Sequence, residues 1–394
     1  MNRANGVIAA ILFLAAAGCL ALGNHIYFAV FGLSLLFALS QALFEARQAC
    51  FRAEFQDIPY IRNLIIRSLL GFAALCIVAY LTNSAVFTMW AWVGSFIVVL
   101  LCTKDPLRVD HDARFDWTSL AFMVKFGTGV AVSAVATASL APLLRLIATH
   151  LIPLDEAGKM MLAMDIAQKV IGVLGVSISL LIFQATVRAR EFGHDHIVKE
   201  RITKQVSIVF ALISASVVGY LCVGDAFSAL FISSDYREIY DENIVWCMAA
   251  AGLIGFRSFA LDSIFVVTGR SQLGIISPVS TGLVAVVATV MLGWFEGFSS
   301  VTFSQGMLIG AAGGVLVSFV LSRLALSYSV NWLEILKIAT ANLGMWGILK
   351  LSADVHGLSG LILSVAIGCC VFGIALYALD ALGLRAALRS LRAS

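Results

Sequence analysis

Long apolar stretches recur along the whole chain, and they constrain its fold more than any other feature. Each offers about 20 mostly apolar residues, enough for a helix to cross the hydrocarbon core of a bilayer. They are continuous, whereas the strands of a membrane β-barrel alternate apolar and polar residues. The sequence therefore predicts an all-α polytopic membrane protein with about twelve transmembrane helices, at residues 5–23, 26–44, 64–82, 85–102, 118–150, 159–185, 205–224, 243–266, 272–292, 302–325, 332–350 and 358–382.

The amino-acid composition excludes several other classes of protein. Only 12% of the 394 residues are charged and 61% are apolar, whereas a soluble domain has roughly 25% charged residues. This excludes a cytosolic enzyme, a nucleic-acid-binding protein and a disordered chain. The first stretch also resembles a signal peptide, but the many stretches after it favour a first membrane span.

The residue types that carry chemistry form no recognisable reaction centre. The eight cysteines lie in or beside apolar stretches without a C-x-x-C pair, which indicates free thiols rather than disulfides or a zinc site. His194-Asp195-His196 resembles a metal-binding segment, but no further ligand is near it in the sequence, which favours a solvated loop. Nucleotide-binding, metalloprotease and hydrolase motifs are absent from the sequence. We expect no enzyme activity, no catalytic residue, no metal and no cofactor.

The distribution of Lys and Arg predicts the orientation of the chain. With the N-terminus in the cytoplasm, 18 of these residues fall on the cytoplasmic side and 3 on the outer side. This bias follows the positive-inside rule and predicts that both termini are cytoplasmic. The expected location is a bacterial-type inner membrane.

Six charged residues fall well inside the expected spans. A charge at mid-bilayer costs about 2.5–3.5 kcal/mol, so such residues tend to face protein or a wet cavity. Lys169 is about 15 Å into its helix and Arg257 about 14 Å from its inner end, while Lys125 and Arg145 are closer to the interface. The four cations outnumber the two acids, which predicts a cavity that prefers anions. The six are Lys125, Arg145, Asp165, Lys169, Arg257 and Asp262.

The spacing of these charges predicts which of them can meet. Asp165 and Lys169 are four residues apart, so they share a helix face and either pair with each other or remain available. Arg257 and Asp262 are five apart, which turns them away from each other on an α-helix. Lys125 and Arg145 are twenty apart and lie on nearly opposite sides of an ideal helix.

Small residues in the spans predict close packing of helices. Gly306 and Gly310 have G-x-x-x-G spacing, and Gly313 and Gly314 follow them. Such stripes let two helices approach closely. We expect helix packing here and no contact with a substrate.

Several short segments together resemble the polysaccharide flippases (O-antigen and exopolysaccharide, Wzx-like) of the MOP superfamily, which also contains the MATE multidrug transporters. Their order is similar to that of the family's second helical lobe, and the segment at 41–55 is similar to the end of a first-lobe helix. They are DWTSL at 116–120, PLDEAG at 153–158, DIAQ at 165–168, VRAREFG at 187–193, FISSDYR at 231–237 and VTGR at 267–270.

The resemblance implies a two-lobe bundle and a division of the chain. Residues 1–114 would form a shortened N-terminal lobe of about four helices, and 115–326 a C-terminal lobe of about six. Residues 327–394 would form a terminal helix pair and a basic cytoplasmic tail. Compared with the family, the first two helices are then missing, which implies either a shortened transporter or an inactive family member.

The resemblance also implies a function. A polyprenyl pyrophosphate-linked oligosaccharide would move from the cytoplasmic to the outer leaflet by alternating access of two lobes. Lys125, Lys169, Arg257 and Arg145 would contact the anionic lipid-linked glycan, because cations offset the desolvation of pyrophosphate. Asp165 and Asp262 would carry a coupling ion. Membrane lipids, and possible polysaccharide-assembly proteins, are the expected partners, and nucleic acid is not.

Two other functions remain open at this point. A MATE-type drug/cation antiporter would need an acid-rich cavity, and the excess of cations argues against it. A membrane glycosyltransferase or polysaccharide polymerase usually has a sizeable extramembrane loop, and the longest outer loop expected here is only 225–242.

Overall fold

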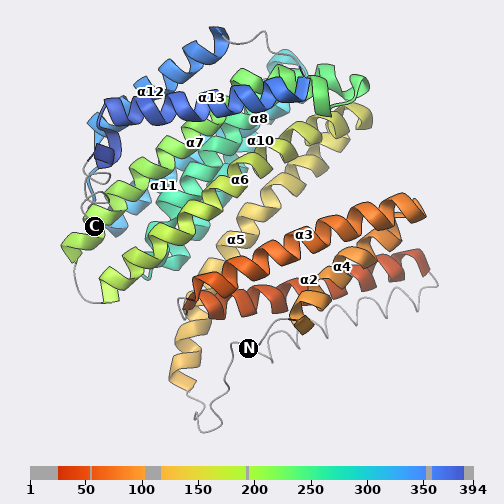
Figure 1. The fold of residues 1–394 in the computed structure, drawn as a ribbon, viewed down its shortest axis with the longest axis horizontal. Coiled ribbons are helices and arrows are strands. Elements are labelled where there is room, and N and C mark those ends of the chain that lie inside the picture. The colour runs from red at the N-terminus through yellow and green to blue at the C-terminus, as the bar shows by residue number, and fades with distance from the viewer. Residues whose placement is uncertain (1–24, 54–55, 103–116, 192–194, 352–356, 386–394) are drawn as a thin grey trace. The chain divides into compact units, whose positions relative to one another are not determined.

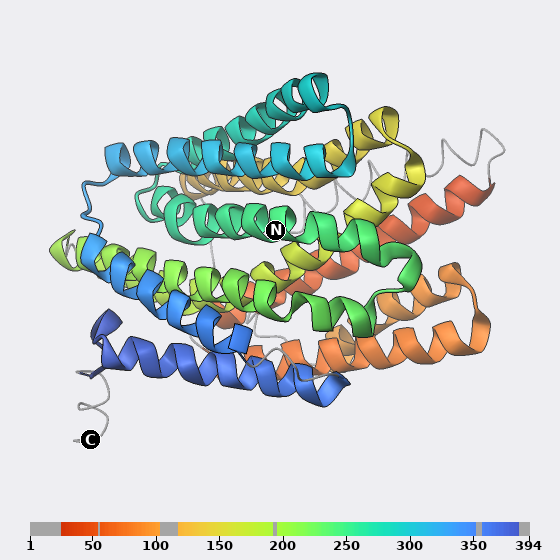
Figure 2. The same ribbon diagram turned by 90° about the horizontal axis from the view of Figure 1, so that it is seen from above.

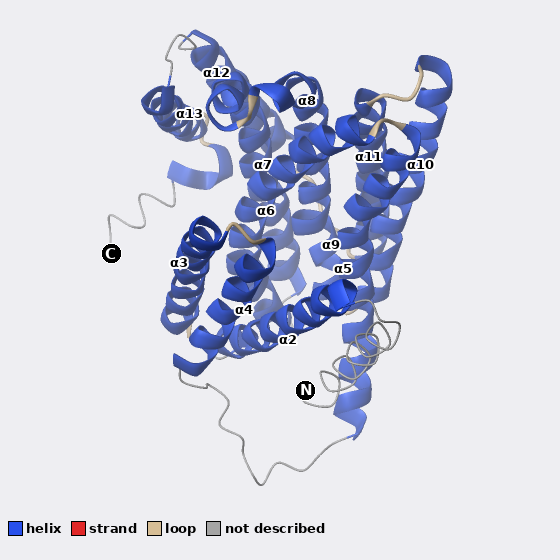
Figure 3. Ribbon diagram, turned by 90° about the vertical axis from the view of Figure 1, so that its right-hand side faces the viewer, coloured by secondary structure: helices blue, strands red, loops and turns tan. Residues whose placement is uncertain are grey.

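Helices form nearly all of the described chain. The computed structural model describes residues 25–53, 56–102, 117–191, 195–351 and 357–385. Within these ranges Figure 3 shows helices and connecting loops, and no strand. The predicted all-α class is confirmed.

The chain divides into two units, Met1–Phe115 and Asp116–Ser394. The first contains α2 (His25–Ala53), α3 (Asp57–Thr82) and α4 (Ala85–Cys102). In this unit α3 and α4 pack against each other, and Phe44, Phe96 and Val99 form a small buried cluster. The Arg67 guanidinium lies 4.1 Å from the centre of the Phe96 ring, which gives this cation an aromatic partner.

The second unit contains the remaining helices, labelled in Figure 1. Most of them pack around one large apolar core drawn from α5 to α11. The last two long helices, blue in Figure 2, lie side by side and pack on α7 around a second cluster. The elements are α5 (Trp117–Leu151), α6 (Leu154–Glu191), α7 (Asp195–Phe231), α8 (Ser234–Phe256), η1 (Arg257–Leu261), α9 (Asp262–Val267), η2 (Ser271–Ile275), α10 (Ile276–Glu296), α11 (Ser300–Ala325), α12 (Trp332–Leu351), α13 (Gly357–Ala378) and η3 (Ala381–Gly383).

The expected spans and the helices agree well. Each span from 26–44 to 332–350 lies in one helix or a continuous helical run, and α13 covers the last span, 358–382, as far as Ala378. The first span, 5–23, lies outside the described residues. Among the described helices, seven are long and apolar enough to cross a membrane. Many of their large apolar side chains are exposed, among them Phe72 at 70% and Leu283 at 64%. A surface of this kind requires lipid around it, so the protein is a multi-pass membrane protein.

The helices extend further than hydropathy predicts. The connection expected at 186–204 is helical to Glu191 and again from Asp195, and the one expected at 225–242 shrinks to two residues between α7 and α8. Lys, Arg and Glu are good helix formers, so the helices continue beyond their apolar parts. The expected loop position of His196 is therefore wrong, because His196 lies in the first turn of α7.

Candidate functional site

Arg257 occupies an unusual place in the middle of a membrane-capable helix. The helical run Ser234–Val267 is continuous, but Arg257–Leu261 forms a π turn in which the backbone N–H of Asp262 donates to the carbonyl of Arg257. A π turn closes over five residues instead of four and often marks a functional position. The Arg257 residue is completely buried, with a relative exposure of 0%.

The π turn corrects the expectation that Arg257 and Asp262 point apart. The Nε atom of Arg257 lies 3.2 Å from Oδ2 of Asp262. Five residues span about one and two-fifths turns of an α-helix, but the wider π turn brings residues i and i+5 to the same side. The two charges therefore form a buried intrahelical ion pair.

Hydroxyl groups from three neighbouring helices complete this pair. The Arg257 guanidinium donates to Thr281 Oγ1 of α10 at 2.5 Å and to Thr137 Oγ1 of α5 at 3.3 Å. Ser318 of α11 donates to Asp262 Oδ1 at 2.6 Å. A buried charge is tolerated only when it is paired and hydrogen-bonded. Both charges here are engaged in contacts between helices, and Arg257 does not reach the protein surface.

The glycine stripe of α11 makes room for this arrangement. A Cβ atom at Gly314 would lie 1.9 Å from Thr281 Oγ1 and 3.3 Å from Arg257 Nη1. At Gly310 it would lie 2.5 Å from the Cβ of Ala285, and at Gly306 2.0 Å from Oγ1 of Thr289. The prediction of close helix packing is confirmed for these glycines, which bring α10 and α11 together beside the buried charges.

A second ion pair joins α5 and α6 in a more exposed setting. Arg145 pairs with Asp165, and their side chains are 32% and 51% exposed. The alternative pair of Asp165 with Lys169 is not formed. Within the described part of the chain, the Lys169 side chain has no hydrogen bond or ion pair, and it is exposed on α6.

The six charges of the spans therefore separate into two pairs and two single lysines. Lys125 is exposed on α5. Twenty residues of helix separate it from Arg145, roughly 30 Å along the axis. Like Lys169, it makes no ion pair with any described residue. Since each acid is bound to an arginine, the net positive charge inside the spans resides on Lys125 and Lys169.

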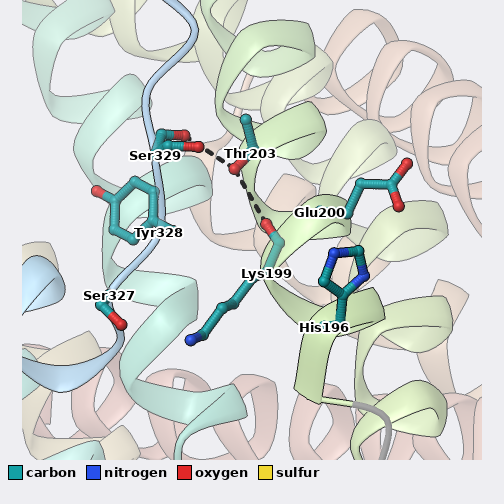
Figure 4. A pocket seen from close by; sticks show the side chains of 7 residues that line it. All are labelled: His196, Lys199, Glu200, Thr203, Ser327, Tyr328 and Ser329. Atoms are coloured by element: carbon teal, nitrogen blue, oxygen red, sulfur yellow. Dashed lines mark hydrogen bonds between the residues drawn. The ribbon is translucent and has the colours of Figure 1, made fainter.

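A pocket of about 520 Å³ lies elsewhere in this unit, at the start of α7 (Figure 4). One wall is the first turns of α7, with His196, Lys199, Glu200 and Thr203. The other wall is the connection between α11 and α12, with the three residues 327–329. Among the described residues, no group of three or more His, Cys, Asp or Glu side chains could hold a metal ion.

The sequence did not indicate the partners of the buried pair. Thr137, Thr281 and Ser318 are single hydroxyl residues in apolar helices, and such residues are common there. Thr281 is the easiest of the three to anticipate, because the stripe Gly306, Gly310 and Gly314 predicts a close contact between α11 and another helix. The spacing of these glycines alone does not show that this other helix is α10, which contains Thr281.

The helices and charges define a class of protein: an all-helical, multi-pass membrane protein with two ion pairs and two single lysines among the six charges of its spans. No protein-family model matches the chain, and no curated protein matches its sequence. Among solved structures it is similar to the lipid II flippase MurJ in an inward closed conformation, with a TM-score of 0.70 and 12% sequence identity. The alignment covers 96% of this chain and 82% of that chain. The chain thus has a MurJ-like fold.

Proposed function

We propose that this protein is a flippase of the MOP superfamily in a bacterial inner membrane, with both termini in the cytoplasm. It moves a polyprenyl pyrophosphate-linked oligosaccharide from the cytoplasmic to the outer leaflet for surface polysaccharide synthesis, by alternating access. The fold likeness to a lipid II flippase over 96% of the chain supports a lipid-linked substrate. The division into lobes 1–114 and 115–326 with a terminal part 327–394 stays a prediction.

The observation that carries this proposal is the positive charge inside the spans that no aspartate neutralises. Arg145 and Arg257 are each bound to an aspartate, so Lys125 and Lys169 are the cations available to a ligand. An unpaired ammonium group within a membrane span is costly unless it meets water or an anion. Pyrophosphate is a dense anion that would repay this cost through charge-assisted hydrogen bonds.

The exposure of the predicted contacts favours some of them over others. Lys169 and Lys125 are exposed, and Arg145 is partly exposed. Arg257 is completely buried, so in this conformation it supports the helices and would meet substrate only after they rearrange. A coupling role for Asp165 or Asp262 would require the ion to compete with an arginine for the carboxylate.

The decisive test is transport by the purified full chain in proteoliposomes. The probe is a fluorescent polyprenyl pyrophosphate-linked sugar, and a membrane-impermeant quencher reports its leaflet. Lys169→Ala should slow flipping by about tenfold, the effect of losing one charged hydrogen bond. Lys159→Ala, on the same helix but paired with Asp155 at 2.6 Å, is the matched control and should flip at the wild-type rate.

Failure of the wild-type chain to move the lipid-linked sugar would overturn the proposal. Flipping by Lys169→Ala at the wild-type rate would remove Lys169 from the substrate path. Transport of an organic cation, without movement of the lipid-linked sugar, by the wild-type chain would instead identify a MATE-type antiporter.

A further inference from the structure

We propose that the pocket between the start of α7 and the α11–α12 connection binds an anionic group bearing phosphate, such as the headgroup of a membrane phospholipid. This site is distinct from the single lysines of the spans. It does not rest on the proposed transport function, because it uses different residues and predicts binding rather than movement.

The connection is held firmly enough to form a wall. The Thr203 hydroxyl donates to the carbonyl of Ser329 at 2.8 Å, as the dashed line in Figure 4 shows. Tyr328 is buried, its hydroxyl group lies 3.0 Å from Ser322 Oγ, and its carbonyl accepts from Arg323 at 3.2 Å. Burial raises the pKa of the Tyr328 phenol, so it remains a neutral hydrogen-bonding group.

The other groups that face the pocket remain available for a ligand. In Figure 4 the Lys199 side chain extends into the space between the two walls, on the side where the Ser327 hydroxyl lies. Within the described residues, neither of these two side chains makes a hydrogen bond or an ion pair, and both residues are exposed. An ammonium and a hydroxyl are suitable donors for phosphate oxygens. His196 also lines the pocket, with its ring on the side of Glu200.

The acid in the lining does not cancel this positive charge. Glu200 forms an ion pair with Lys204 at 2.8 Å. This leaves Lys199 as the lining charge without a counter-ion among the described residues. A pocket of this composition favours an anion, and its volume of about 520 Å³ accommodates a phosphate with the polar group that carries it.

The position of the pocket favours a lipid headgroup. His196 is the first residue of the membrane-capable segment His196–Phe231, and the connection follows the end of Ser300–Ala325. Trp332, at the start of α12, is 69% exposed, which is typical of the level of the lipid headgroups. The positive-inside rule places this level at the cytoplasmic leaflet, where anionic lipids occupy basic pockets between helices.

The test compares two sources of phosphate with the full chain. In the first arm, the protein is placed in nanodiscs of phosphatidylcholine and phosphatidylglycerol, and native mass spectrometry counts retained phosphatidylglycerol. Lys199→Gln should lower retention by about tenfold, and Glu200→Gln should raise it. Arg270→Gln loses the same charge at an exposed position outside the pocket and should leave retention unchanged.

In the second arm, inorganic phosphate is titrated into detergent-solubilised protein. Binding that Lys199→Gln abolishes, without selective retention of the lipid, would support the phosphate site and assign it to a soluble ligand. The proposal is overturned if neither probe binds, or if Lys199→Gln and Arg270→Gln lower binding equally. A thermal unfolding midpoint of Lys199→Gln equal to that of the wild type confirms that the loss is not unfolding.

Discussion

The two ion pairs of the second unit have the same chemistry and opposite surroundings. Arg257 and Asp262 lie within one helical run, with side-chain exposures of 1% and 14%, and hydroxyl groups of α5, α10 and α11 surround them. Arg145 and Asp165 join two helices at a partly open surface. The two pairs differ in depth: the first is buried and contacts several helices, whereas the second is open to its surroundings.

Breaking the buried pair should have the largest effect. Arg257→Ala leaves the carboxylate of Asp262 in an apolar interior without its counter-ion, which should lower the free energy of unfolding by about 3–5 kcal/mol. The measurement is the thermal unfolding midpoint of the full chain in detergent. The double variant Arg257→Met with Asp262→Leu removes both charges and should lose less than the single variant. A single variant as stable as the wild type would contradict the burial of this pair.

Closing the space beside the buried pair should have an intermediate effect. Gly314→Ala adds a Cβ that would overlap Thr281 Oγ1, and overpacking of this kind costs about 1–3 kcal/mol. The same unfolding measurement applies. Gly344→Ala on α12 is the control, because a Cβ there meets no atom within 4 Å. It should leave stability unchanged or raise it by up to about 1 kcal/mol. Equal losses in both variants would disprove a specific role for the glycine stripe.

Breaking the exposed pair should have the smallest effect on stability. Arg145→Ala should cost about 1 kcal/mol or less, because a partly exposed pair gains little over solvated charges. A double-mutant cycle with Asp165→Ala measures the coupling between the two side chains. A loss as large as that of Arg257→Ala would show that depth does not separate the two pairs.

The sequence predicts the helices well because lipid imposes a simple requirement. A span needs about 20 apolar residues with its backbone satisfied internally, and hydropathy detects this from 26–44 to 358–382. The ends of the helices are harder to predict from the sequence. Polar helical turns such as those from Asp195 into α7 have no hydropathy signal, and for this reason the sequence predicts a loop at His196.

The candidate site shows where sequence reasoning stops. The excess of cations within the spans is visible in the sequence, but its location depends on which residues pair. A periodicity of 3.6 residues per turn predicts that Arg257 and Asp262 point apart, and the π turn departs from this periodicity. The pairing of Asp165 with Arg145 depends on how α5 and α6 meet, which spacing within one helix cannot show.

The π turn has a consequence for changes in chain length. It holds one residue more than an α-helical turn would, so deleting a single residue from 257–261 lets the segment return to regular α-helix. When the deleted residue lies between the two charges, the arginine and the aspartate are then four residues apart. This spacing places them on one face of an α-helix, so the ion pair can form again. The helical run should therefore tolerate the loss of one residue between its two charges, whereas the same loss in a regular α-helical part would rotate the residues on its two sides by about 100°.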